Sequence, residues 1–322
     1  MFKDHPSYHI PISALCHLFL GCPSLLILPK TFAVIAQVLA DTGNSQAQIE
    51  IMMSLVNFLS SEDQASNDTD DTDAKVDIKD LLGTGASFSD AGIPSAVMQT
   101  FLGRILQLTI SQNMELAKPA LQAVVIALEQ GIVHPILCIP TICAMESCED
   151  TGMSRSAFHI HQKMHEKHTS FIHSKVFESV NCIYAYQLAR NSPPCGISKC
   201  TNVSVFAPMY TLLRQTKFRR NEFLGHLCDL LDVKSKSKLK EGAFNLENYT
   251  FIYFLSQAIA TIPFSTVNEV LIVVRKLNWM CSFMADNMET DAPEPHDVWQ
   301  SLHLESFESA RQYILSRYDL AG

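Results

Sequence analysis

Hydrophobic residues recur at every third or fourth position along most of this chain, and no sustained stretch alternates hydrophobic and polar residues. Such spacing is typical of amphipathic helices, whereas a half-buried strand needs strict alternation. Leu116, Ala120, Val124 and Leu128 are each four residues apart, and Gly131 follows them as a helix stop. Glycine is also scarce, with 12 residues in 322, and folds rich in tight turns need more of it. The sequence therefore predicts an all-α chain.

The predicted helices form pairs that repeat along the chain. Pairs begin near residues 114, 153, 202 and 245, a spacing of about 40 to 50 residues, which is the period of HEAT arrays. In these arrays each antiparallel pair buries its hydrophobic face against the next. An irregular helical domain would give the same periodicity, but the spacing favours a HEAT-repeat helical solenoid of stacked antiparallel helix pairs. The predicted helices include residues 30–40, 46–60, 153–168, 170–190, 202–215, 218–232, 245–262, 266–284 and 304–318.

Composition divides the chain into four predicted segments. Residues 1–61 are expected to form N-terminal helices, and residues 62–95 a flexible acidic linker. The first part of this linker, residues 62–80, holds eight acids, and such a segment buries too little apolar surface to become ordered. Residues 96–284 then form the helix array, and residues 285–322 form a C-terminal tail with one helix.

The net charge of −9 is distributed unevenly. Residues 1–150 have 6 Lys and Arg against 17 Asp and Glu, and residues 241–322 have 4 against 11. Residues 151–240 have the opposite balance, 14 against 5. A basic segment between acidic flanks predicts a surface that binds a polyanion.

The ten cysteines are predicted to be reduced. Six of them lie within helical hydrophobic patterns, where a thiol behaves as a small core side chain: Cys16, Cys138, Cys143, Cys182, Cys228 and Cys281. The first apolar run, residues 14–28, is short and interrupted, whereas a membrane span needs about 20 residues. We therefore expect a soluble intracellular protein.

No catalytic motif is present, and no cofactor or metal is predicted. Cys138 follows His134 closely, but the intervening Pro135 and the apolar surroundings favour a buried structural thiol over a nucleophile. Five histidines are dense enough to suggest a metal site, yet they lack a zinc-binding motif. They are His159, His161, His165, His168 and His173.

Four stretches resemble one known family in order and spacing. Residues 126–145 contain the pattern Q-G-I-V-H-P-I-L-C-I-P, and residues 163–178 read KMHEKHTSFIHSKVFE. Residues 206–231 read FAPMYTLLRQTKFRRNEFLGHLCDLL, and residues 251–275 include a Pro-Phe turn. All four resemble the C-terminal HEAT-repeat region of the cohesin loaders, the adherin or Nipped-B-like proteins. The motif positions are Gly131, His134, Pro135, Cys138, Pro140 and His173.

This resemblance implies a non-enzymatic, nuclear and chromatin-associated adaptor in sister chromatid cohesion. Such a loader engages the cohesin ring, holds double-stranded DNA without sequence preference against the ATPase heads, and stimulates their ATP hydrolysis to promote loading. The family also has an accessory subunit, whose N-terminal binding region we expect to be absent here. The alternative is a helical-repeat scaffold that binds only proteins.

The candidate DNA-binding residues form three basic clusters. Phosphate contacts by such clusters would carry no base readout, and an ordinary solvated face is the alternative for each. The third cluster is expected in a loop, residues 233–243. The residues are Arg155, Lys163, Lys167 and Lys175; Arg214, Lys217, Arg219 and Arg220; and Lys234, Lys236 and Lys238.

Overall fold

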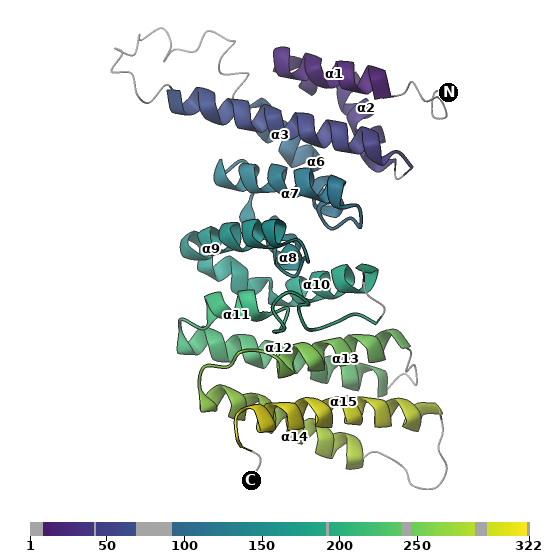
Figure 1. The fold of residues 1–322 in the computed structure, drawn as a ribbon, viewed down its shortest axis with the longest axis vertical. Helices are drawn as coiled ribbons and strands as arrows, with labels where there is room; N and C mark the ends of the chain where they lie inside the picture. Colours follow the sequence, from purple (N-terminus) through teal and green to yellow (C-terminus); the bar gives the residue numbers. More distant parts are fainter. Residues whose placement is uncertain are drawn as a thin grey trace. The chain divides into compact units, whose positions relative to one another are not determined.

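The computed structural model describes residues 9–41, 43–68, 92–190, 193–239, 246–286 and 295–320. Helices dominate these ranges, and the β-structure found in them is one isolated bridge between Ile197 and Ser204 (Figure 1). The all-α prediction is confirmed. Among the described residues, no helix combines the length and hydrophobicity that a membrane crossing requires. The chain divides into two compact units, Met1–Cys138 and Ile139–Gly322.

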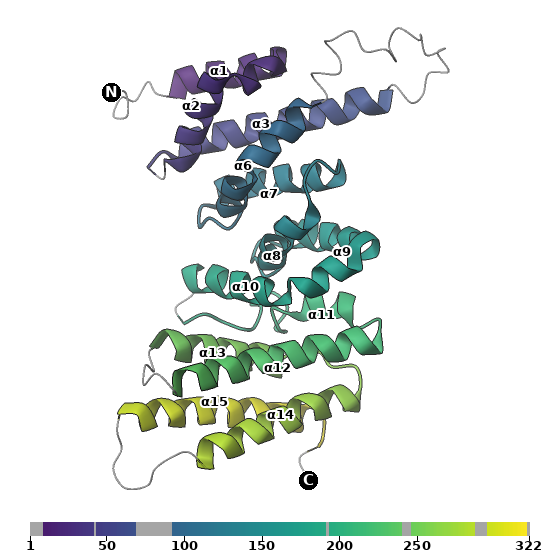
Figure 2. The same cartoon turned by 180° about the vertical axis from the view of Figure 1, so that it is seen from behind.

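The first unit is a stack of helices around a hydrophobic core. The long helix α3 packs against α1 and α7, and α6 packs against α7 (Figure 2). Phe58, Met52 and Leu59 are almost fully buried in this core. Gln48 closes the turn before α3 by donating to the carbonyl oxygens of Leu39 at 2.9 Å and Asp41 at 3.0 Å. The elements are α1 (His9–Gly21), a 3-10 helix (Pro23–Ile27), α2 (Pro29–Ala40), α3 (Ser45–Asp68), α6 (Ile93–Thr109) and α7 (Met114–Glu129).

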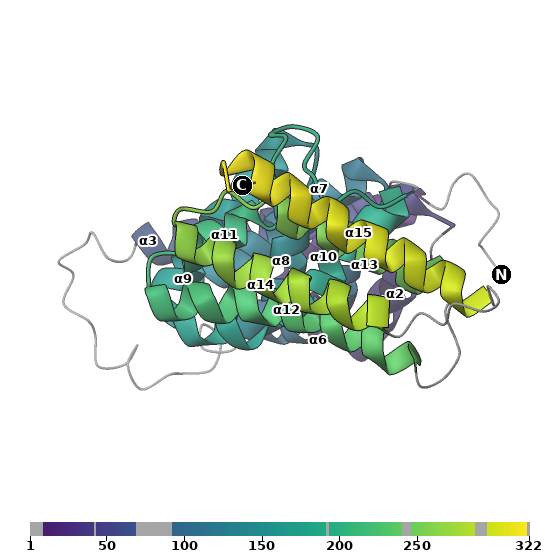
Figure 3. The same ribbon diagram turned by 90° about the horizontal axis from the view of Figure 1, so that it is seen from below.

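The second unit stacks helix pairs in the manner predicted for HEAT repeats. Helix α12 packs against α13 and α14, and α15 packs against both α13 and α14, which places α14 and α15 together at the end of the unit (Figure 3). Phe223, Phe254 and Phe307 are fully buried between these layers. The elements are α9 (Thr151–Ser174), α10 (Val176–Arg190), α11 (Ala207–Leu213), α12 (Lys217–Leu239), α13 (Leu246–Ala260), α14 (Val267–Asp286) and α15 (Pro295–Arg317). Helix α8 (Pro135–Glu146) includes the boundary between the units.

The ends of the predicted linker are helical. Helix α3 continues to Asp68, and α6 begins at Ile93, although the sequence predicts a linker over residues 62–95. The packed part of α3 already provides the helix nucleus. Extending it through the following residues, which include the helix formers Glu, Gln and Ala, therefore costs little free energy. Residues 69–91 lie outside the described ranges.

Several other helix ends differ from the prediction. Helix α11 begins at Ala207 instead of residue 202, because Asn202 adopts a left-handed φ of 53° in a turn closed by the Asn202 N–H to Ser198 O bond of 2.9 Å. Helix α12 continues to Leu239, through most of the predicted loop, and α15 begins at Pro295 instead of residue 304. The extension of α12 adds polar turns, for which hydrophobic periodicity has no signal.

Candidate nucleic-acid interface

Helix α9 presents positive side chains on one face. Its N-terminus is fixed by Asp150, whose Oδ1 accepts the N–H groups of Gly152 at 2.8 Å and Met153 at 2.9 Å. The opposite face is buried through Ala157, Ile160 and Met164. We call the outward side the α9 basic face; Lys163 is half-buried and the others are exposed. It consists of Arg155, His159, Lys163 and Lys167.

A break in α9 limits this face. His168 has non-helical dihedral angles, φ −138° and ψ 48°, within the helix. The sequence predicts separate helices over 153–168 and 170–190, so the break is placed correctly, but α9 resumes and continues to Ser174. Lys175 lies beyond the break and forms an ion pair with Glu178 at 2.7 Å. It therefore does not extend the α9 basic face.

His165 and His173 of α9 add little charge to this face. Burial lowers the pKa of His165, and the positive charges of His161 and Arg219 lower it further. Burial also lowers the pKa of His173, although Glu222 lies 3.4 Å from its Nδ1 and opposes the change. Both imidazoles are therefore kept neutral near pH 7, and the constant positive charge comes from lysine and arginine.

The second predicted cluster lies where α11 meets α12. Arg214 and Lys217 are exposed, and Arg214 Nη1 donates to Ser265 Oγ at 3.4 Å. Arg219 is half-buried, and its Nη1 lies out of solvent without a hydrogen-bond partner among the described residues. Of this cluster, Arg214 and Lys217 are the side chains most open to a ligand.

Arg220 is held inside the protein. Its Nη1 lies 3.0 Å from Glu269 Oε1, and the side chains are 12% and 0% exposed. Glu269 of α14 also accepts from Thr266 Oγ1 at 2.6 Å, from the Ser265 N–H at 3.1 Å, and from the Tyr210 hydroxyl. Burial alone would raise the pKa of Glu269, but these hydrogen bonds and the Arg220 charge hold it below its usual range. The pair joins α11, α12 and α14, which gives Arg220 an internal role; a DNA contact by it stays a prediction.

The third cluster is not in a loop. Lys234, Lys236 and Lys238 belong to the final turns of α12, which ends at Leu239, so the predicted loop was wrong for these positions. Alternating lysines and serines interrupted the hydrophobic pattern, but Lys is a good helix former and continues a helix that packing has already established. The side chains lie outside the described parts of the chain.

A cleft adjoins the α9 basic face. It encloses about 400 Å³ between α9, residues 198–205 and α11. Arg155 is the one basic residue in its lining, and hydroxyl groups from several elements surround it. Among them are Thr151, Ser154, Ser204 and Thr211. This lining offers hydroxyl groups and the positive charge of Arg155, and it also includes Glu146, whose carboxylate is paired with His161.

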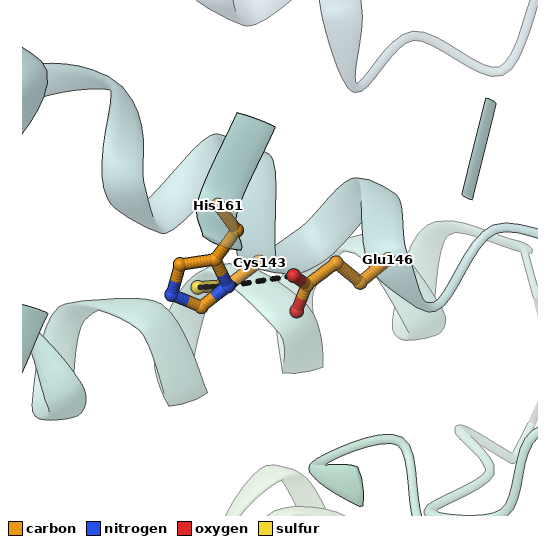
Figure 4. A group of neighbouring side chains, drawn as sticks. All are labelled: Cys143, Glu146 and His161. Atoms are coloured by element: carbon orange, nitrogen blue, oxygen red, sulfur yellow. Dashed lines mark hydrogen bonds and ion pairs between the residues drawn. The ribbon is translucent and has the colours of Figure 1, made fainter. Parts of the chain in front are cut away.

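Three buried side chains form the strongest polar cluster near this cleft (Figure 4). Cys143 and Glu146 project from α8 towards His161 of α9, and the His161 Nδ1 to Glu146 Oε1 distance is 2.6 Å. Burial would lower the pKa of His161, but the Glu146 carboxylate raises it well above 6.5. The three could supply metal ligands, since their ligand atoms lie within 4.8 Å of one another, yet the ion pair by itself explains their burial.

The same cluster is unsuited to nucleophilic catalysis. Cys143 Sγ lies 4.0 Å from His161 Nδ1, the nitrogen already bonded to Glu146. A catalytic histidine uses one ring nitrogen for the nucleophile and the other for the carboxylate. Cys138, the thiol singled out in the sequence, is fully buried, and burial raises its pKa to about 12.

The predicted motif residues shape the turn before α8. Gly131 has φ +70°, and the Ile132 N–H donates to the Ala127 carbonyl at 2.9 Å, which closes α7. His134 Nδ1 accepts the Ile136 N–H at 3.3 Å. Pro135 opens α8, and Pro140 lies inside it. The motif therefore reflects helix ends and not a reactive site.

Sequence reasoning missed the two buried carboxylates, Glu146 and Glu269. Glu269 did have a local signal, because Thr266-x-x-Glu269 before an apolar run is a capping-box pattern. Glu146 had none, since its partner His161 belongs to another helix.

Comparison with known proteins identifies the family. The family described as sister chromatid cohesion C-terminus matches residues 94–280. Human Nipped-B-like protein is 24% identical over 300 residues, which are 89% of this chain and 10% of that protein. Fission yeast sister chromatid cohesion protein mis4 is 22% identical over 262 residues, 78% of this chain and 16% of that protein.

A solved structure shares the fold. The C-terminal fragment of the Chaetomium thermophilum cohesin loader SCC2 superimposes with a TM-score of 0.77 and 18% identity, over 97% of this chain and 22% of that one. The predicted helical-repeat class is thereby confirmed. The chain spans about a tenth of the length of the Nipped-B-like proteins that it matches. It belongs to the Nipped-B family of sister chromatid cohesion proteins and corresponds to their C-terminal region.

Proposed function

We propose that this chain is a cohesin-loader adaptor that binds double-stranded DNA through the α9 basic face, Arg214 and Lys217. The observation that carries the proposal is the row of Arg155, His159, Lys163 and Lys167, each one helical turn after the last on an outward face, in which the arginine and the two lysines supply the positive charge. Such a row reaches successive phosphates and reads no bases, so the binding is independent of sequence.

The proposal extends to the partners of the family. The chain engages the cohesin ring on nuclear chromatin and, with DNA held against the ATPase heads, stimulates their ATP hydrolysis and promotes loading. Membership of a sister chromatid cohesion family supports this assignment. In this role the chain acts as an adaptor and the ring carries out the chemistry.

Charge reversal tests the DNA contact. The double variant Arg155→Glu/Lys167→Glu changes two exposed positions of the α9 basic face. Each lost phosphate contact weakens binding to all DNA sequences alike. We therefore expect the double variant to lose about tenfold or more in affinity for any duplex. Fluorescence anisotropy with two unrelated duplexes measures it.

The matched control changes the net charge equally at exposed lysines of the first unit, Lys30→Glu/Lys118→Glu. This control is expected to retain most of the affinity. An equal loss in both double variants would show that only the total charge matters and would contradict the proposed face. Arg220 is unsuitable for reversal, since its ion pair with Glu269 supports the fold.

A protein scaffold without DNA binding is the second candidate. The buried pair of Arg220 with Glu269 and the exposed pair of Lys175 with Glu178 favour it, since both engage predicted DNA contacts within the protein. Under this reading, cohesin ATPase stimulation would be the same for the wild type and Arg155→Glu/Lys167→Glu. Under the first reading, the double variant would lose the DNA-dependent part of the stimulation.

A further inference from the structure

A second cleft of the Ile139–Gly322 unit lies between α13, α15 and Ile197, far along the sequence from the α9 basic face. It encloses about 320 Å³. Side chains at every third or fourth position of α13 form one wall. The lining combines small residues with tyrosines. The small lining residues include Ser256, Ala260, Ser309 and Ala310, and the tyrosines are Tyr249, Tyr253 and Tyr313.

The walls are held in place by specific contacts. Tyr249 stacks on His303 with ring centroids 6.1 Å apart, and Arg317 Nη1 donates to the Thr261 carbonyl at 3.3 Å. Helices α13 and α15 therefore run side by side in the same direction. The third side is closed by the Gly196 N–H, which donates to Gln257 Oε1 at 2.8 Å. A Cβ at Gly196 would lie 2.4 Å from the Phe254 carbonyl oxygen, so only glycine permits this approach.

The lining combines aromatic faces with one negative charge. Tyr253 and Tyr313 are 38% and 49% exposed, and the rings of Tyr249 and Tyr253 are 6.1 Å apart and inclined by 33°. Glu305 is the charged residue of the lining. It is exposed, and within the described ranges its carboxylate has neither an ion pair nor a hydrogen bond. The cleft therefore offers π faces and a carboxylate to a cation.

A buried hydroxyl group in the same cleft lacks a partner. Ser256 is 2% exposed, and its Oγ forms no hydrogen bond with any described residue. An unpaired buried polar atom is costly, but this Oγ is closed to solvent and several other buried polar atoms are also unpaired, so the preference of the cleft for a ligand comes from the tyrosine faces and Glu305. Arg317 donates to the Thr261 carbonyl but does not line the cleft, so Glu305 is the charged side chain that an incoming positive group would meet.

We propose that this cleft binds the arginine side chain of a basic peptide segment from a partner protein. The planar guanidinium stacks on the exposed tyrosine faces and donates to the Glu305 carboxylate. Arginine fits better than lysine because only its guanidinium combines planar stacking with several fixed donors. Residues 241–322 carry 4 basic against 11 acidic side chains, which favours a basic partner. The inference is independent of DNA binding, which uses the basic segment.

The test uses the full chain and a fluorescein-labelled Gly/Ser peptide that contains two arginines. Fluorescence anisotropy should show saturable binding. The same peptide with citrulline keeps the shape without the charge and should bind about tenfold more weakly, as expected for loss of a charge-assisted contact. Glu305→Gln should produce a similar loss, and Tyr253→Ala a loss of several-fold.

Glu308→Gln is the matched control, because Glu308 is also exposed on α15 but does not line the cleft. It should bind the arginine peptide like the wild type, and circular dichroism melting should show all variants folded. Equal binding of the arginine and citrulline peptides would overturn the proposal. So would equal effects of Glu305→Gln and Glu308→Gln, or the absence of saturable binding to the wild type.

Discussion

At the scale of single residues, the buried pair of Glu146 and His161 is the contact whose loss we expect to destabilise the fold. The two side chains are 1% and 0% exposed, and their bond connects α8 to α9. Removing one member leaves an uncompensated buried charge or donor, whereas replacing both by apolar groups removes the need for a partner. The pair therefore stabilises the fold only when both partners are present, because each satisfies the buried polar group of the other.

The mutual dependence of Glu146 and His161 predicts that the stability losses of the two single variants do not add in the double variant. Glu146→Leu and His161→Leu should each lower the free energy of unfolding by about 3–5 kcal/mol, and the double variant should lose much less than the sum. Urea denaturation measures all four proteins. Additive losses would contradict a coupled pair and would assign the effects to packing.

The raised pKa of His161 also predicts a pH dependence. Because the folded-state pKa lies above its ordinary value of 6.5, protonation stabilises the folded state. The contribution is fully present below the unfolded-state pKa of about 6.5 and is lost as the pH rises through the folded-state pKa. The difference in unfolding free energy between the wild type and His161→Gln should shrink as the pH rises above neutrality. A difference that grew with pH would mean that His161 is neutral in the folded protein.

At the scale of elements, Glu269 connects three helices through Arg220, Tyr210 and Thr266. Glu269→Gln keeps the shape but removes the charge, and we expect it to lower the unfolding free energy by about 3 kcal/mol. Glu178→Gln, which breaks the exposed pair with Lys175, is the control and should cost less than about 1 kcal/mol. Urea denaturation midpoints of the two variants measure the difference. Equal losses of unfolding free energy in Glu269→Gln and Glu178→Gln would show that the Glu269 pair is no stronger than a surface pair.

The Glu269 carboxylate makes the stability of the contact between α11, α12 and α14 dependent on acid pH. Its folded-state pKa is held below the usual range, so the stability that it contributes is present above the unfolded-state pKa and is lost as the pH falls through the folded-state value. The stability advantage of the wild type over Glu269→Gln should therefore disappear in acid. Urea denaturation over a series of acidic pH values measures it, and an advantage that persists at low pH would show that the carboxylate is not ionised in the folded state.

Helix pairing was predictable because each helix carries its own hydrophobic pattern. Leu116, Ala120 and Val124 indicate the buried face of α7 without knowledge of any neighbour, and all three are buried. The ends of α3 and α12 were not predictable in this way, because they are polar turns that extend a packed helix. Contacts such as Arg220 with Glu269 join residues far apart in sequence, so no local pattern could show that Arg220 faces inwards.

At the scale of the whole molecule, the distribution of charge matters more than its sum. A chain with net charge −9 is a poor candidate for binding DNA, yet residues 151–240 carry 14 basic against 5 acidic side chains. Part of this excess lies on the α9 basic face, and part is engaged in ion pairs, which include the buried pair of Arg220 with Glu269 and the exposed pair of Lys175 with Glu178. The sequence therefore located the basic segment, but only the fold separates its exposed cations from its buried ones.

The salt dependence of DNA binding tests this account most directly. If Arg155, Lys167, Arg214 and Lys217 each meet one phosphate, the logarithm of the binding constant should fall with the logarithm of salt concentration with a slope of about −3.5. Arg155→Glu/Lys167→Glu should reduce that slope to about −2, and Lys30→Glu/Lys118→Glu should leave it unchanged. A wild-type slope near zero, or the same slope in all three proteins, would contradict DNA binding by the α9 basic face.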